Sequence, residues 1–416
     1  MSTAAWFTTR ATLLVTALTN TMRRSNYNSR CSMNSWPSMR IWFLWSLLVA
    51  VALPTYAVER VSVEQLEQKL AAQQPPSPDK PLAALWDDQL ADLVGNLTLT
   101  ERLSDARLDR ITQKLHPGPL CKQALRLMAY RSAFLDPPAD ELPKLAPPDL
   151  ETQKRMIAAA GSKVLQNLKR LPNFFATRAT VRYSGVPADM NRNPQLLRVG
   201  LFREGESTGE ITFRGGEEVT DPMKPKSDEP GLQAGLESWG EFGPEPVTIL
   251  LDGQRGTIDF HHWENAPTGV VAVFHYSVPR LGSHYEVHYH CPTAEPFHDN
   301  PPYHGSFSID PATGALVRVT VETESRPDDP ISHVASIIEY SRMVIGERSY
   351  ICPVRSVTTM VEEASACPSR HHNPKMAQPI LMINERSFTD YHRLGSTARI
   401  LGTSPDTPAP PSGKQQ

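Results

Sequence analysis

Most signatures of cofactor and metal chemistry are missing from this sequence. It contains no CxxC pair, no HExxH pair and no glycine-rich motif of the kind that cradles a phosphate or a dinucleotide. A zinc ribbon, a thioredoxin-type redox site, a zincin protease and a dinucleotide-binding enzyme are therefore without support. We predict no cofactor and assign no catalytic residues.

An excess of charge of one sign is also missing. Lys and Arg together number 42 and Asp and Glu 45, which gives a formal net charge of -3. Nucleic-acid-binding domains usually carry a basic patch or a high pI, so we expect no nucleic-acid partner. Proline, by contrast, is abundant: 38 of 416 residues, about 9% against an average near 5%. This excess predicts compact pieces joined by loops and linkers.

Hydrophobic runs long enough to span a membrane are lacking. The apolar run at 41–53 has 13 residues, whereas a bilayer-spanning helix needs about 20. The run follows Met39 and Arg40 and ends in small residues, an order typical of a signal peptide cleaved after Ala57. We therefore expect residues 1–38 to be an extension upstream of the true start, 39–57 to be a signal peptide, and the mature chain to be periplasmic or secreted without a transmembrane segment. An uncleaved membrane anchor is the alternative.

Cysteine is scarce, with five in the whole sequence. Four follow the expected cleavage site: Cys121, Cys291, Cys352 and Cys367. Export permits disulfides, but four cysteines allow three full pairings between which a sequence does not choose. Cys352 and Cys367 flank a strand-like run and could close a local loop. The sequence favours neither this bridge nor its absence.

Residues 62–135 show the hydrophobic period of helices. We predict helices over 63–72, from a capping box at Thr98 and Glu101 to His116, and over 120–135. They would form a small helical module whose apolar faces pack on one another; a docking surface for an envelope partner is the alternative. Residues 136–149 (DPPADELPKLAPPD) are predicted to be a proline-rich linker, semi-rigid because proline favours extended geometry.

Residues 150–402 are predicted to form an α+β domain. One amphipathic helix covers 150–170, and a period of two begins after Asn173. The strands expected there lie at 247–251, 257–263, 270–278, 284–290, 303–309, 315–323, 334–344 and 349–362. Consecutive strands with short turns indicate an antiparallel meander, with the helix on one face and water on the other. We expect a curved half-barrel sheet, long loops and a hairpin within 186–245, and a disordered tail at 403–416.

Several stretches carry a resemblance to known proteins. They are LPNFFATRATV (171–181), GSFSIDPATGALVRVTVE (305–322), EYSRMVIGERSYICPVRSV (339–357), NERSFTDYHRLGSTARIL (384–401), LTLTERLSDARLDRI (97–111) and SAFLDPPADELP (132–143). They resemble a group of uncharacterised exported proteins from acidobacterial genomes. One helix followed by such a meander is also remotely similar to the LolA-like half-barrels of periplasmic lipoprotein carriers. The group has no established activity, so the resemblance implies a fold and no catalytic residue.

The stretch HYEVHYHC, residues 284–291, is the most suggestive for chemistry. Successive side chains of a strand point to opposite faces. The face expected to turn toward the core carries Tyr285, Val287, Tyr289 and Cys291. The other face carries His284, Glu286, His288 and His290. The histidines are therefore expected on the solvated side of the strand.

A metal site is the alternative interpretation of this stretch. Neighbouring side chains on one face of a strand lie about 7 Å apart, so Glu286, His288 and His290 could converge on zinc, which in catalytic sites has three protein ligands and an open position. His275 or His304 could complete such a set. We favour the solvated strand face, because no helical ligand pair supports the metal; a pH-dependent surface charge is a third interpretation.

Residues 205–209 formally match GxSxG, the nucleophile elbow of hydrolases. That elbow requires a strand before the serine and a helix after it. Here Ser207 is followed by EITFRGG, a strand-like run that ends in a turn. We therefore interpret the match as the tip of a hairpin.

Three functions follow as expectations. The favoured one is a non-enzymatic envelope protein that binds or carries a lipophilic ligand, a lipid or a lipidated peptide, in a cleft between the sheet and the 150–170 helix. Each buried methylene would contribute about 0.8 kcal/mol. The second is a metal-dependent enzyme or metal-binding protein using Glu286, His288 and His290, with zinc as its cofactor. The third is an envelope scaffold that docks through its helices.

Overall fold

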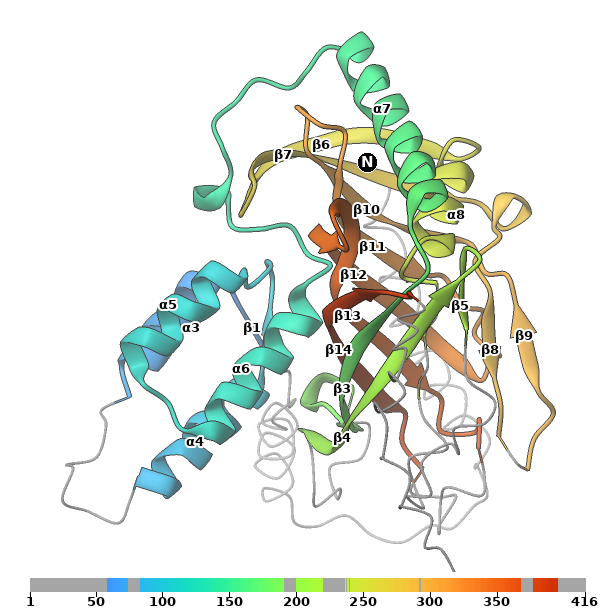
Figure 1. Ribbon diagram of the computed structural model, residues 1–416. Helices are drawn as coiled ribbons and strands as arrows, with labels where there is room; N and C mark the ends of the chain where they lie inside the picture. Colours follow the sequence, from blue (N-terminus) through green and yellow to red (C-terminus); the bar gives the residue numbers. More distant parts are fainter. Residues whose placement is uncertain are drawn as a thin grey trace, which may run out of the picture. The chain divides into compact units, whose positions relative to one another are not determined.

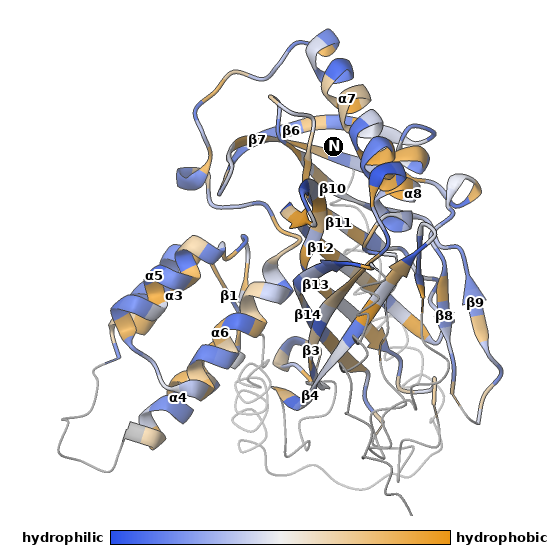
Figure 2. Cartoon of the chain, viewed as in Figure 1, coloured by the Kyte–Doolittle hydropathy of each residue, from blue (hydrophilic) through white to orange (hydrophobic). Residues whose placement is uncertain are grey.

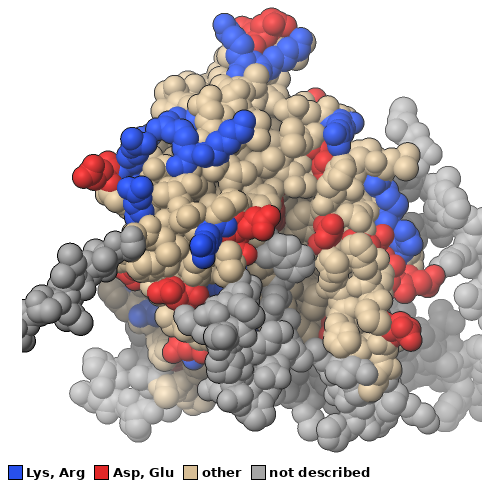
Figure 3. All heavy atoms as spheres, turned by 45° about the vertical axis from the view of Figure 1, so that its right-hand side comes forward, with Lys and Arg blue, Asp and Glu red and all other residues tan. Residues whose placement is uncertain are grey.

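The computed structural model describes residues 58–73, 83–190, 200–219, 236, 238, 240–291, 293–367 and 377–395. The predicted upstream extension, signal peptide and C-terminal tail lie outside these residues. Within the described ranges, no helix combines the length and the apolar character that crossing a membrane requires. On the face drawn in Figure 3, acidic and basic side chains are interspersed among larger areas of other residues.

A ten-stranded antiparallel sheet dominates the described chain (Figure 1). Its strand order is β5-β4-β3-β14-β13-β12-β11-β10-β7-β6, and β5 and β6 form its two open edges. The strands are β3 (Phe174–Val186), β4 (Gly200–Arg214), β5 (Glu217–Val219), β6 (Thr257–Ala266), β7 (Gly269–Val278), β10 (Tyr303–Ile309), β11 (Leu316–Thr323), β12 (Ile331–Ile345), β13 (Arg348–Glu362) and β14 (Ile380–Arg393). The predicted α+β class with an antiparallel sheet is confirmed.

The period of two places most of these strands well. The predicted strand at 303–309 coincides with β10, and the two longest predicted strands correspond to β12 and β13. Their connecting turn contains Gly346 at φ 67°, a left-handed conformation that glycine adopts without a steric cost. Two further small sheets pair β1 (Glu59–Val61) with β2 (Leu97–Leu99) and β8 (Val287–Tyr289) with β9 (Phe297–Asp299).

The predicted strand at 247–251 is wrong. These residues belong to helix α8 (Pro244–Gly253). A short apolar run does not distinguish a buried strand from a buried helix, and the decisive signal lies before it. Pro244 occupies the first helical position, where its missing N–H removes only a donor that would have no partner in the helix.

One face of the sheet is covered by α7 and α8. Helix α7 (Leu150–Arg170) begins at Asp149, whose carboxylate accepts a hydrogen bond from the Thr152 N–H at 2.7 Å. Its buried side packs with α8 on a cluster that includes Phe274, Phe307 and Ile338. The prediction that the 150–170 helix packs on the sheet is therefore confirmed. We refer to this side as the covered face.

The opposite face, expected to meet water, is covered in part by α6 (Pro119–Ser132). Leu127 and Tyr130 of this helix are buried against strand residues that include Ile337, Val357 and Ile383. Figure 2 shows the matching pattern, with hydrophobic residues along the central strands. Strands covered on both faces have few positions left for solvent, which explains the nearly continuous apolar run near Ile337.

Helices α3 (Val63–Ala71), α4 (Ala83–Gly95), α5 (Asp105–Leu115) and α6 share a hydrophobic cluster with β1 and β2. The predicted capping box at Thr98 is wrong, because Thr98 lies in β2 and α5 is capped by Ser104. Glu101 instead accepts a hydrogen bond from the Val63 N–H at 2.8 Å, at the start of α3. Helix α4 was not predicted from the sequence.

The disulfide joins Cys291 to Cys367, with their Cα atoms 5.6 Å apart. Cys352 is buried in β13 and Cys121 in α6, both as free thiols. The bridge between Cys352 and Cys367 does not form, because the extended strand from Cys352 to Glu362 alone covers about 33 Å. The observed bridge ties the histidine-bearing stretch 284–291 to the segment that follows β13.

Candidate functional site

The burial of residues 284–291 follows the predicted alternation. The exposed side chains are His284, Glu286, His288 and His290, and the buried or partly buried ones are Tyr285, Val287, Tyr289 and Cys291. Only Val287–Tyr289 form a strand, β8, which pairs with β9 instead of joining the large sheet. The histidines lie on the solvated side, as expected for the favoured interpretation.

Two of the three predicted metal ligands lie together. His288 opposes His298 of β9, their ring centroids are 4.3 Å apart, and the His288 Nε2 lies 3.2 Å from the Glu286 Oε2. The candidate ligand atoms of Glu286, His288 and His298 all lie within 4.8 Å of one another. His290 is not part of this group. The third member of the group, His298, comes from a separate strand, so the spacing within residues 284–291 does not reveal it.

The two histidines proposed as additional ligands lie elsewhere. His275 of β7 faces Asp136 and His261, and His304 of β10 lies near Glu322 and Glu324. Neither histidine joins the group around His288, so the structure divides these histidines between the large sheet and the separate β8–β9 pair.

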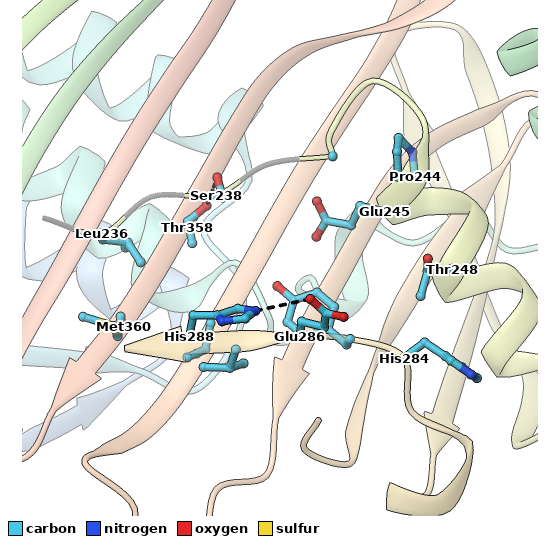
Figure 4. A pocket seen from close by; sticks show the side chains of 14 residues that line it. Leu236, Ser238, Pro244, Glu245, Thr248, His284, Glu286, His288, Thr358 and Met360 are labelled. Carbon is cyan, nitrogen blue, oxygen red and sulfur yellow. Dashed lines mark hydrogen bonds and ion pairs between the residues drawn. The ribbon is translucent and has the colours of Figure 1, made fainter. Parts of the chain in front are cut away.

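A pocket of about 170 Å³ opens beside this stretch (Figure 4). It lies between the covered face of β12 and β13, the start of α8 and residues 284–288. Its apolar wall is formed mainly by Leu236, Val287, Val334 and Met360, and its polar groups include Ser238, Glu245, Thr248 and Thr358. Glu286 and His288 also line it, so the histidine cluster and the pocket adjoin each other.

Glu245 is the unusual polar group of this pocket. It lies in the first turn of α8, its residue is only 9% exposed, and Figure 4 shows its carboxyl group pointing into the pocket. Its Oε2 has no hydrogen-bond partner among the residues that the structure describes. Burial, and secondarily the charge of Glu241, raises the pKa of this carboxyl group well above its usual range. Burial therefore favours the protonated form of Glu245 over the carboxylate.

A second buried acid, Glu241, lies four residues earlier and forms an ion pair. Its Oε1 lies 2.9 Å from the Arg386 Nη1, and Glu241 and Arg386 are 1% and 4% exposed. The Ser238 hydroxyl donates to the same oxygen at 2.8 Å. The Tyr340 hydroxyl donates to the Glu241 carbonyl at 3.1 Å. This arrangement fixes the segment that leads into α8.

A row of polar side chains crosses β12, β13 and β14 beneath that segment. In the sheet register Ser336 opposes Thr358, which opposes Asn384, and Ser356 opposes Arg386. All five are buried. Sequence reasoning missed this row and Glu245, because polar residues at alternate strand positions normally indicate a solvated face. The available signal was the presence of Arg386 and Asn384 within an otherwise apolar strand.

Asp252 anchors the pocket wall. This aspartate, 1% exposed, accepts hydrogen bonds from the His284 N–H at 2.8 Å and from the Tyr303 hydroxyl at 2.9 Å. The His284 Nδ1 lies 2.7 Å from its other oxygen. The end of α8 thereby holds the start of 284–291 against β10.

The GxSxG match forms neither an elbow nor a hairpin tip. Ser207 lies within β4, opposite Thr180 of β3, and its Oγ accepts a hydrogen bond from the Arg182 Nη1 at 2.9 Å. The hairpin turn comes later, at Gly215 and Gly216. The predicted position of the turn is therefore wrong, because the strand continues through both glycines of the motif.

Protein-family models, curated proteins and solved structures give no match to this chain. The resemblance to exported acidobacterial proteins and to LolA-like half-barrels stays a prediction. Function must accordingly be argued from the geometry of the pocket and its neighbours.

Proposed function

We propose that this protein is a non-enzymatic binding protein of the cell envelope, and that its pocket takes a small lipophilic ligand with one hydrogen-bonding or cationic group. The observation that carries the proposal is Glu245, a buried carboxyl group that points into the pocket with one oxygen unpartnered among the described residues. An unsatisfied buried polar group costs about 1–3 kcal/mol. A ligand that satisfies it recovers that free energy on binding.

The pocket volume sets the size of the buried group. About 170 Å³ is slightly more than the roughly 150 Å³ cavity that accommodates benzene. About six carbon atoms can therefore be buried against Leu236, Val334 and Met360. A lipid or lipidated peptide would leave most of its chain outside, so a short apolar group fits this pocket better than a whole acyl chain.

The charges around the pocket select the polar group of the ligand. Neutral Glu245 can donate a hydrogen bond to a hydroxyl or carbonyl oxygen, or it can ionise to pair with an amine. Glu286 also lines the pocket, and Glu241 lies close enough to influence Glu245. A ligand carboxylate would meet these like charges, so we expect anions to be rejected.

The proposal includes a half-barrel form for the sheet. Its strand pairs contain irregularities at several places, including Arg182/Tyr183, Phe260/His262 and Glu339/Tyr340. Bulges of this type bend a strand and increase its twist, which supports a curved sheet. The hydrophobic cluster shared by α3–α6 likewise supports a helical module over 62–135.

A series of linear primary amines tests the proposal by calorimetry. Each added methylene should strengthen binding about fourfold, from about 0.8 kcal/mol per buried CH₂, until about six carbons fill the pocket. Affinity should then level off. Continued growth to twelve carbons would instead favour a lipid-length site, and absence of binding by every amine and by the matching alcohols would contradict the proposal.

The variant Glu245→Gln tests the polar contact. It should weaken binding of hexylamine about tenfold or more, because an ionic hydrogen bond contributes about 1.5–3 kcal/mol. Glu347→Gln is the matched control, since Glu347 is exposed in the turn between β12 and β13. Equal affinity of the two variants would show that Glu245 does not contact the ligand.

A metal-binding function at the mouth of the pocket is the second candidate. It rests on the group formed by Glu286, His288 and His298, two imidazoles and a carboxylate with ligand atoms within 4.8 Å of one another. Such donors suit zinc. Zinc that is retained by the native protein and lost from His288→Ala would support this function, whereas equal zinc content in both would exclude the group as its site.

A further inference from the structure

The segment after α6 meets the β6–β7 hairpin, from which it is distant in the sequence, on the exposed side of these strands. They contribute Asp136, which follows α6, His261 of β6 and His275 of β7. The His261 Nε2 lies 3.0 Å from both carboxylate oxygens of Asp136, and the His275 Nε2 lies 3.9 Å from its Oδ1. The two imidazole rings are stacked with centroids 3.7 Å apart. Both Nε2 atoms thus face one carboxylate.

A β-bulge accounts for the position of His261. Phe260 opposes Phe274 and His262 opposes Val273, so His261 is the extra residue of β6 without an opposing residue. The register shift directs its ring onto that of His275, which opposes Asp259 in the regular part of the pair. Bulges often re-aim a side chain at a functional site.

Backbone hydrogen bonds of the segment that begins at Asp136 hold the Asp136 carboxylate in place. The Asp136 carbonyl accepts a hydrogen bond from the Arg102 N–H at 2.8 Å, and the Arg102 guanidinium pairs with Glu264 of β6 at 2.5 Å. Further along, the Glu141 carbonyl accepts from Asn265 at 3.1 Å and the Ala146 carbonyl from Trp263 at 2.8 Å. The predicted linker 136–149 therefore contacts β6 at several points.

The geometry suits a tetrahedral transition metal. Zinc binds imidazole nitrogen and carboxylate oxygen at about 2.0–2.2 Å, which places neighbouring ligand atoms of a tetrahedron about 3.3 Å apart. The separations of 3.0 and 3.9 Å from Asp136 bracket that value.

We propose that Asp136, His261 and His275 bind one divalent transition metal ion of the zinc class, with the fourth position open to water. This donor set of two imidazoles and one carboxylate suits zinc, copper and nickel better than magnesium or calcium. The ion would join the segment after α6 to β6 and β7. The site is separate from the pocket and does not depend on the function proposed for it.

The test uses a background in which the other histidine cluster is disabled. In the full chain with His288→Ala and His298→Ala, zinc chloride is titrated by calorimetry, and the zinc retained after gel filtration is measured. One zinc per chain is expected. Adding Asp136→Asn, His261→Ala or His275→Ala should weaken zinc binding at least about tenfold each, by analogy with the loss of groups that support metal ligands.

Thermal unfolding separates a lost ligand from a damaged fold. Each variant should unfold without zinc at about the same temperature as the background protein, and zinc should raise only the background's unfolding temperature. His392→Ala, which alters a histidine of β14, should retain the response. A background protein that binds no zinc, or zinc binding that survives His261→Ala and His275→Ala unchanged, would overturn the proposal.

Discussion

Glu241 and Glu245 lie four residues apart and are both buried, yet their surroundings differ. Glu241 is paired with Arg386 and accepts a hydrogen bond from Ser238. Glu245 faces a pocket, and its Oε2 has no partner among the described residues. A buried charge with a counter-ion holds two parts of a fold together, whereas a buried acid without one is a candidate for contact with a ligand.

The difference arises from what lies opposite each acid. Glu241 is placed over the polar row of β13 and β14, where Ser356 and Arg386 supply donors. Glu245 begins the next turn, inside α8, and points beyond that row into the pocket. The same residue type therefore has a structural role at one position and, in the proposed function, a role in ligand binding at the other.

Breaking the pair of Glu241 should have the largest effect. Replacing Arg386 by Met leaves a buried carboxylate without its counter-ion, which costs about 3–5 kcal/mol of unfolding free energy. Urea denaturation followed by circular dichroism measures this change. A loss of unfolding free energy below about 1 kcal/mol would mean that other groups stabilise the Glu241 carboxylate. The ion pair with Arg386 would then not distinguish Glu241 from Glu245.

Removing the disulfide should have the next largest effect and should act on the pocket side. Replacing Cys291 and Cys367 by Ala opens a bridge between residues 76 positions apart, for which a loss of about 2–4 kcal/mol is typical. Because the bridge fixes residues 284–291, hexylamine binding should weaken as well. Unchanged stability after this double replacement would show that the bridge does not constrain the pocket wall.

Glu245 also predicts a pH dependence of stability. The pKa of Glu245 is raised in the folded state above its ordinary value of 4.5, so between those values the native protein holds a proton that the unfolded chain has lost. Stability contributed by Glu245 is present below pH 4.5 and falls as pH rises, by about 1.4 kcal/mol per pH unit. Urea unfolding at several pH values measures this slope.

The variant Glu245→Gln isolates this slope, since His275 and His333 have lowered pKa values and act in the opposite direction. Their contribution is common to both proteins and cancels in the difference. The wild type should lose stability relative to the variant as pH rises above 4.5. A flat difference across this range would contradict a raised pKa.

The smallest effect should come from Glu245→Gln at a fixed acidic pH of about 4.5. Glutamine is nearly isosteric with the neutral acid, so unfolding free energy should change by less than about 1 kcal/mol. Thermal unfolding of both proteins in one buffer measures this. A loss as large as that of the Arg386 variant would assign Glu245 a structural role.

Much of the fold could be predicted from periodicity, since alternation in the sequence reports which side of a strand is buried. It placed β10, β12 and β13 and the burial of residues 284–291. It failed at α8, where the apolar run is too short for a period to distinguish helix from strand. Periodicity also does not reveal that α6 packs on Ile337, because this contact joins segments about 200 residues apart in the sequence.

The candidate site was less predictable. Glu286 and His288 stood out through their spacing, but their third partner, His298, comes from another strand. Glu245, the buried acid of the pocket, was not singled out by any sequence pattern. A buried acid is recognisable only when the groups around it are known, because its burial depends on segments far away in the chain.

The protonation state of Glu245 at neutral pH tests the account most directly. An infrared difference spectrum between wild type and Glu245→Gln should show the carbonyl band of a protonated carboxylic acid. Addition of hexylamine should convert this band to that of a carboxylate. A wild-type spectrum that shows only carboxylate at neutral pH before any ligand is added would contradict the claim that this buried acid is neutral and held for a ligand.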